Sequence, residues 1–206
     1  MQRKLADGRE FRDMPLLAER EDAAHVVEGY AATFGEYYVL WEERDFRLME
    51  RIDPHAFDEC DMSDVLMMYD HMGAVFARTR NGTLEVTTDE VGLRVRANLG
   101  GTERGRQMYE EIKGGYIDRM SFSFRAAEDV RTYATDHDTG VETCYRTITK
   151  IAKLYDVAPV SQPANDMTSI SARSCADGVI KQLAAERRQR RADKIRKIKL
   201  MIEMRY

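Results

Sequence analysis

The fold is decided by the stretch Tyr116-Ile117-Asp118-Arg119-Met120-Ser121-Phe122-Ser123-Phe124. Side chains on a β-strand point alternately to its two faces, so this stretch should bury Met120, Phe122 and Phe124 together on one face. Ser121 and Ser123 should then lie on the opposite, non-core face. The stretch therefore predicts a half-buried strand that carries two hydroxyl groups.

Further strands are predicted on both sides of this stretch. They cover the ranges 26–31, 37–41, 65–69, 84–88, 92–99 and 145–160. The range 65–69 is a continuous apolar run with the length of a buried strand, whereas the range 92–99 alternates apolar and polar residues. Asn81-Gly82 is a favoured two-residue hairpin turn and predicts a hairpin at that point of the chain.

Two helices are predicted within the same region. Asp53 is a good N-cap and Pro54 suits the first helical position, so a short helix should begin there. A longer helix is predicted over residues 102–113, with Thr102 as its cap and Gly114 at its end. Many strands and few helices predict a mainly β fold with helical insertions (α+β), arranged as a barrel or a sandwich.

The charge of the chain changes abruptly near residue 176. Residues 177–206 carry ten basic and four acidic side chains, a net charge of +6, so the rest of the chain carries −10. Such a break in composition marks a boundary. Beyond it, Ile195, Ile198 and Ile202 lie on one face of a basic amphipathic helix. We therefore predict a loose N-terminal leader (1–24), a central domain (25–175) and a basic helical tail (176–206).

The composition excludes several classes of protein. The chain of 206 residues is 43% hydrophobic with a net charge of −4, which is ordinary for a soluble globular protein and gives no overall nucleic-acid signal. No apolar run is long enough to cross a bilayer, and no secretory signal follows the first residues. Cys60, Cys144 and Cys175 are widely spaced, which suits a reducing cytosol. We expect a cytoplasmic protein that uses no metal or cofactor.

Three side chains are candidates for the chemistry of an activated serine. A serine hydroxyl is a weak nucleophile and needs a base within hydrogen-bond reach, while a third group fixes the tautomer of that base. His71 follows a buried strand, Ser121 lies on the aromatic-backed strand, and Asp156 lies late in the strand before Pro159. Spacing alone does not select them, because each residue also has an ordinary role in packing or turns.

Several blocks of sequence, in a fixed order, strengthen this choice. They are Glu28-Gly29-Tyr30-Ala31, the ranges 50–57 and 65–71, Gly115 to Phe124, and Leu154-Tyr155-Asp156-Val157-Ala158-Pro159 with the residues up to Asn165. In these blocks the chain, from about Val26 to Arg173, resembles the prohead (capsid-maturation) serine proteases of tailed bacteriophages, relatives of the herpesvirus assemblin proteases. It departs from the family pattern at His55 and Ser123, where glycine is usual, at Asp70, where asparagine is usual, and at Asp156, where glutamate is common.

The resemblance implies an assemblin-like β-barrel core in residues 25–175 and a serine endopeptidase. Ser121 would be its nucleophile, His71 its base and Asp156 the third member of the triad, with Ser123 left as an alternative nucleophile. An oxyanion hole should follow the third triad strand, near residues 162–165. The implied partners are the major capsid protein and its scaffolding segment, and autocleavage is implied as well. The implied location is the assembling procapsid in the host cytoplasm, and self-association stays open.

Two other functions compete with this interpretation. A non-catalytic assembly or scaffold factor would bind capsid protein through its tail and would need neither His71 nor Ser121. An esterase or amidase usually carries a Gly-x-Ser-x-Gly elbow, which the surroundings of Ser121 lack. The basic tail itself is a solvated helix, a docking segment for an acidic partner such as the scaffold, or, least favoured, a nucleic-acid contact.

Overall fold

The computed structural model describes residues 9–15, 25–161, 182–190, 192–193, 195–197 and 200. In chain order its strands are β1 (Glu10–Pro15), β2 (Val26–Thr33), β3 (Tyr38–Glu43), β4 (Phe46–Ile52), β5 (Leu66–Tyr69), β6 (Met72–Arg78), β7 (Leu84–Thr88), β8 (Gly92–Asn98), β9 (Arg119–Thr135) and β10 (Glu142–Val160). The helical elements among them are α1 (Glu103–Lys113) and the short 3₁₀ helix η1 (Thr79–Asn81). The fold is therefore mainly β, as the sequence predicts.

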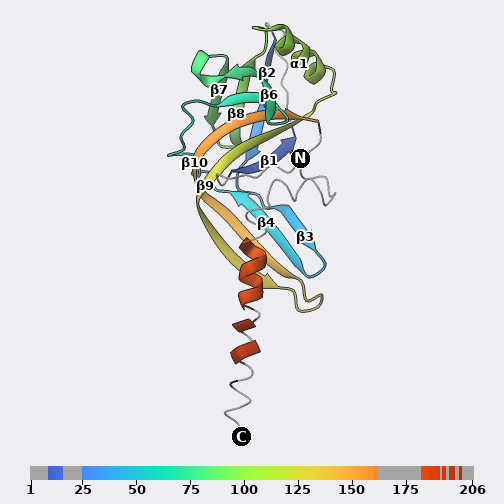
Figure 1. Ribbon diagram of the computed structural model, residues 1–206, viewed down its shortest axis with the longest axis vertical. Helices are drawn as coiled ribbons and strands as arrows, with labels where there is room; N and C mark the ends of the chain where they lie inside the picture. Colours follow the sequence, from blue (N-terminus) through green and yellow to red (C-terminus); the bar gives the residue numbers. More distant parts are fainter. Residues whose placement is uncertain are drawn as a thin grey trace.

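The strands form two sheets around one long antiparallel hairpin. Figure 1 shows β9 and β10 as two long, curved neighbours that run through most of the folded chain. The larger sheet has seven strands, with the order β1-β9-β10-β4-β3, and β5 joins it by pairing with both β10 and β6. The smaller sheet has the order β2-β8-β7. A barrel was expected from the resemblance, but these pairings run from β1 to β3 without closing among the described residues.

The buried apolar side chains form two clusters. The larger cluster lies between the two sheets and α1, and it includes Met120, Phe122 and Phe124, which are at most 1% exposed. The alternation predicted for the 116–124 stretch is thereby confirmed for its core face. The smaller cluster lies towards the far end of the β9–β10 hairpin and consists of Leu40, Trp41, Phe46, Leu48, Cys144 and Leu183.

The longer predicted helix is confirmed and the shorter one is wrong. α1 begins after Thr102, whose hydroxyl oxygen accepts a hydrogen bond from the Gly105 amide at 3.0 Å. The residues after Asp53 form successive turns instead of a helix. The Asp53 side chain does accept a bond from the His55 amide, but the Ala56 carbonyl accepts the Ile151 amide of β10 at 2.8 Å. Pairing with β10 therefore takes the acceptor that a helix would need.

The turn at Asn81-Gly82 does not join paired strands, so the predicted hairpin is wrong. β6 pairs with β5 in the larger sheet, whereas β7 pairs with β8 in the smaller one. Gly82 has a φ of 73° and donates its amide to the Thr79 carbonyl at 3.0 Å, which ends η1. The left-handed conformation that glycine allows thus carries the chain from one sheet to the other.

The segment predicted to be a loose leader contains a strand. Residues 10–15 form β1, which pairs antiparallel with β9, and Arg12 is only 2% exposed. Apolar periodicity does not reveal this strand, because Glu10 and Arg12 are the buried residues among the β1 side chains that the structure describes. Buried charges are stable where they are paired with each other, which sequence periodicity does not register.

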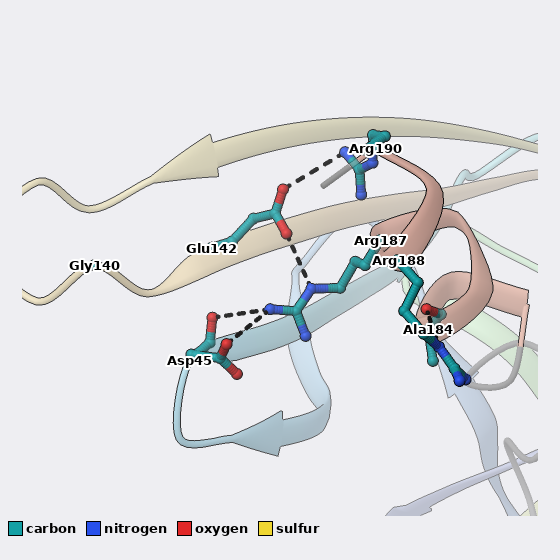
Figure 2. Close-up of a pocket in the computed structure, with 7 residues that line it drawn as sticks. All are labelled: Asp45, Gly140, Glu142, Ala184, Arg187, Arg188 and Arg190. Carbon is teal, nitrogen blue, oxygen red and sulfur yellow. Dashed lines mark hydrogen bonds and ion pairs between the residues drawn. The ribbon is translucent and has the colours of Figure 1, made fainter. Parts of the chain in front are cut away.

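Part of the basic tail packs against the larger sheet. Residues 182–190 are helical, and Leu183 is 1% exposed within the smaller cluster. Figure 2 shows Arg187 of this helix between Asp45 and Glu142, with Nε 3.1 Å from a Glu142 carboxylate oxygen. The predicted boundary at 175/176 and the residues Ile198 and Ile202 lie outside the described residues. Across the part of the chain that the structure describes, no helix is long and apolar enough to cross a membrane.

Candidate active site

His71 lies in the two-residue turn that joins β5 to β6. Tyr69 pairs with Met72, and the two residues between them, Asp70 and His71, have φ values of 45° and 59°. A two-residue hairpin that follows the twist of its strands needs positive φ at both central positions, where glycine and asparagine are preferred. A histidine in this conformation costs about 1–2 kcal/mol. Such strain persists where the surrounding structure fixes it, and it is frequent at functional sites.

The contacts of Asp70 tie this turn to the end of β10. Its amide donates to the Pro159 carbonyl at 3.1 Å. Its carboxylate accepts the Ser161 amide at 3.1 Å and lies 3.2 Å from the Ser161 hydroxyl. This link could not be predicted, because the sequence shows that aspartate replaces the family's asparagine but does not show which residue the aspartate contacts. The link fixes the turn that carries His71 relative to the strand that carries Asp156.

Ser121 lies in the interior of the larger sheet. It is in β9, opposite Asp13 of β1 on one side and Ala158 of β10 on the other. The sequence predicted that Ser121 and Ser123 lie on a non-core face, but both residues are 0% exposed. They do lie opposite Met120, Phe122 and Phe124, but their own face is also covered: the His71 ring lies against Ser121, and β1 runs along the edge of β9.

The structure brings Ser121, His71 and Asp156 together in one chain of hydrogen bonds. His71 Nε2 lies 2.7 Å from Ser121 Oγ, and His71 Nδ1 lies 2.5 Å from Asp156 Oδ1. The side chains of His71 and Asp156 are 14% and 6% exposed, so water screens these contacts weakly. A hydroxyl, an imidazole and a carboxylate in this order are the arrangement that activates a serine for acyl transfer.

The second candidate hydroxyl lies beside this chain without joining it. Ser123 is the cross-strand neighbour of Asp156, yet its Oγ is buried and has no hydrogen-bond partner among the described residues. Phe11 of β1 lies directly opposite Ser123, and its ring centroid is 4.6 Å from that of His71 in an edge-to-face contact. The contact between Phe11 and His71 was also missed from the sequence, because Phe11 falls in the segment taken as a leader.

A buried cluster of charges holds β1 in place. We call Glu10, Arg12, Glu50 and Arg146 the ion cluster. Arg12 donates to both carboxylates, and Arg146 bonds Glu10 at 2.6 Å and Glu50 at 2.7 Å. Burial by itself would raise the pKa of Glu10, but Arg12 and Arg146 outweigh burial and lower that pKa to about 2. The same balance lowers the pKa of Glu50, so both carboxylates stay ionised at neutral pH.

Other parts of the predicted chemistry fall elsewhere. The range 162–165, predicted to supply the oxyanion hole, lies outside the described residues. His55 contacts Asp58 at 3.1 Å on an exposed turn. Within the described part of the chain, no three histidine, cysteine, aspartate or glutamate side chains gather as a metal site would require.

The pocket in Figure 2 lies between the tail helix and the loops at Asp45 and Gly140, and shares no residue with the Ser121 site.

Comparison with known proteins identifies the family of the chain. The family model of the caudovirus prohead serine proteases matches residues 13–180. Searches of curated proteins and of solved structures find no match. The matched range covers most of the chain and contains Ser121, His71 and Asp156. The chain belongs to the caudovirus prohead serine protease family.

Proposed function

We propose that the chain is the serine endopeptidase that removes the scaffolding segment of the major capsid protein during prohead maturation. In this proposal Ser121 is the nucleophile, His71 the general base and Asp156 the group that orients His71. One observation carries it: His71 contacts Ser121 Oγ through Nε2 and Asp156 through Nδ1 at the same time. Its membership of the prohead protease family supplies the class of reaction and the setting.

The proposed reaction is acyl transfer in two steps. His71 Nε2 takes the Ser121 hydroxyl proton as Oγ attacks the carbonyl carbon of the scissile peptide bond. His71 then gives that proton to the leaving amine, and the acyl-enzyme remains. A water molecule, deprotonated by His71, attacks the acyl carbon and releases the new carboxylate together with Ser121. Throughout, the Asp156 carboxylate stays ionised, accepts a hydrogen bond from His71 Nδ1–H and stabilises the imidazolium that forms.

The proposed partners and location follow from the family. The major capsid protein and its scaffolding segment are the proposed substrates, and cleavage takes place inside the assembling procapsid in the host cytoplasm. The protease also cuts itself, with the basic tail as one segment to be removed. The non-catalytic scaffold factor gives no reason for a strained turn that holds His71 between a hydroxyl and a carboxylate.

Co-expression with the cognate capsid protein tests the proposal. Wild type is compared with Ser121→Ala and with Ser123→Ala on gels and by intact mass. We expect cleavage of the capsid protein by wild type and by Ser123→Ala, and none by Ser121→Ala. Identical behaviour of wild type and Ser121→Ala would contradict the proposal. An intact C-terminus in the active wild-type protein would contradict the removal of the tail, but not the cleavage of the capsid protein.

A further inference from the structure

The proposed nucleophile is closed off by the protein's own N-terminal strand. Ser121 is 0% exposed, although the carbonyl carbon of a substrate has to reach its Oγ. β1 runs antiparallel along β9, and its residues 10–15 pair with residues 119–124 on both sides of Ser121. β1 is also a terminal strand of the larger sheet and pairs with β9 alone. Removal of β1 would therefore leave β9, the strand that carries Ser121, as a free edge of the sheet.

An edge of this kind suits an extended peptide. Proteins commonly bind extended segments as an added strand, in which main-chain hydrogen bonds give affinity and alternate side chains give specificity. If β1 were absent, β9 would offer the backbone groups of residues 119–124 to such a segment. The edge would pass directly beside Ser121, so a bound peptide would lie within reach of its hydroxyl.

The side chains of β1 fill the positions that a bound peptide would use. Phe11 lies opposite Ser123 on the face of Ser121, and its ring contacts the His71 ring. Arg12 points to the other face and bonds Glu50, which is 0% exposed and also accepts the Tyr38 hydroxyl at 2.6 Å. An aromatic side chain followed by a basic one therefore makes a contact on each face of this edge, the first with His71 and the second with Glu50.

The ion cluster allows β1 to leave as a unit. β1 contributes one acid, Glu10, and one base, Arg12, so its departure leaves the cluster neutral. Glu50 and Arg146 remain paired with each other at 2.7 Å. An unpaired buried charge is strongly destabilising, and none would be created. The Ser123 hydroxyl, buried here without a partner, would then gain access to water or to the incoming backbone.

We propose that the edge of β9 along residues 119–124 is the peptide-binding edge of the protease, and that β1 fills it as an internal occupant that substrate must displace. The ligand is an extended peptide strand that presents an aromatic side chain towards His71 and a basic one towards Glu50. The proposal rests on the proposed function, because it assumes that Ser121 attacks the peptide held at this edge.

A reversible covalent lock between β1 and β9 tests the proposal. Directly opposite residues in an antiparallel pair have Cα atoms about 4.5–5.5 Å apart, which a disulfide can bridge. The variant is Phe11→Cys with Ser123→Cys, oxidised with oxidised glutathione and reduced again with dithiothreitol. Each single variant is the control for any pairing with a native cysteine. The readouts are the rate of cleavage of purified capsid protein and covalent labelling by a fluorophosphonate.

The outcomes separate the two proposals. We expect the reduced double variant to cleave capsid protein, the oxidised form to be at least about tenfold slower, and dithiothreitol to restore the rate, with both single variants insensitive to redox state. If the oxidised and reduced forms cleave at equal rates, with the disulfide verified by mass, the proposal of a peptide-binding edge at β9 is wrong. The proposed protease function would not be affected by that result. If wild type neither cleaves capsid protein nor reacts with the fluorophosphonate, the proposed function fails and this inference fails with it.

A matched pair of substitutions gives a second test that needs no disulfide. Arg12→Gln removes a guanidinium from the buried ion cluster, and Arg131→Gln removes one from the adjoining, partly buried pair, because Arg131 bonds Asp129, which bonds Arg146. Only Arg12 lies on β1. We expect Arg12→Gln to raise the initial cleavage rate at least about fivefold, the effect of losing about 1 kcal/mol in strand binding, and Arg131→Gln to leave the rate unchanged. A folded Arg12→Gln variant that is no faster than Arg131→Gln would contradict the inference.

Discussion

At the residue scale, the site depends on a histidine held in a conformation that histidine disfavours. Ser121, His71 and Asp156 were the candidates predicted from the sequence, and the structure brings these three side chains into one hydrogen-bonded chain. The left-handed turn at Asp70 and His71 could not be predicted, because its usual sequence is Asn-Gly and aspartate followed by histidine carries no such signal. The turn exists because it is imposed by the pairing of β5 with β6 and by the hydrogen bonds that the Asp70 carboxylate accepts from Ser161.

Relief of this strain gives the first prediction. His71→Gly and His71→Ala both remove the imidazole, but only glycine adopts a φ of 59° without steric conflict. We expect both variants to lose proteolysis, and His71→Gly to have a free energy of unfolding about 1 kcal/mol higher than His71→Ala. Urea denaturation measures this difference. Equal unfolding free energies would show that the turn stores no strain at His71.

The second prediction concerns the carboxylate. Asp156→Asn keeps the size of this buried side chain but replaces the carboxylate, which accepts the hydrogen bond from Nδ1–H, with an amide that also donates. We expect kcat to fall by about 10³–10⁴ with little change in the melting temperature, because the wrong histidine tautomer is favoured. Steady-state kinetics on capsid protein, beside thermal unfolding, gives both values. A variant with wild-type kcat would remove Asp156 from the proposed triad.

At the element scale, strands with apolar periodicity were predictable and the strand built on charges was not. The ranges 26–31, 65–69 and 92–99 each overlap an observed strand, because burial of alternate or continuous apolar side chains leaves a pattern in the sequence. β1 leaves no such pattern, since Glu10 and Arg12 are buried by pairing with Glu50 and Arg146 from strands far away in the chain. Long-range pairing of this kind becomes visible only when the sheet has formed.

The third prediction is an acid-dependent loss of stability through β1. The pKa of Glu10 is lowered to about 2 in the folded protein from an ordinary value of 4.5, so its ionised form favours folding. That contribution is complete above about pH 4.5 and is lost as the pH falls towards 2. For a group this deeply buried it amounts to roughly 3 kcal/mol. We expect the free energy of unfolding to fall between pH 5 and pH 3.

Glu10→Gln is the control for this prediction. The variant should be less stable than wild type at pH 7 and should lose less stability between pH 5 and pH 3, because its amide does not titrate. Urea denaturation at pH 7, 5 and 3 measures how the free energy of unfolding changes with pH in wild type and in the variant. If the free energy of unfolding depends on pH in the same way in wild type and Glu10→Gln, Glu10 is not a source of the acid sensitivity.

At the scale of the whole molecule, two apolar clusters share the long β9–β10 hairpin (Figure 1). The larger cluster backs the strand that carries Ser121, and the smaller one is covered by Leu183 from residues 182–190. Arg190 of this helix also lies over the Tyr133 ring at 3.8 Å. The break in charge predicted a basic helical tail, but its docking site could not be predicted, since one leucine among arginines gives no apolar stripe.

Removal of the apolar anchor gives the fourth prediction. Leu183 is 1% exposed, whereas Leu200, further along the tail, is 50% exposed. We expect Leu183→Ala to weaken docking of the helix by about 2 kcal/mol or more, and Leu200→Ala to have little effect. Hydrogen exchange of the amides in 182–190 should therefore speed up at least about thirtyfold in Leu183→Ala only. Equal exchange in both variants would show that Leu183 does not anchor the helix.

The central claim is that Ser121 is the nucleophile and that His71 activates it. Its most direct test is to treat the purified protein with a fluorophosphonate, digest it, and map the covalent adduct by tandem mass spectrometry, in wild type and in His71→Ala. We predict a single adduct on Ser121 in wild type and its near-complete loss in His71→Ala. An adduct on Ser123, or undiminished labelling of His71→Ala, would contradict the assignment of nucleophile and base.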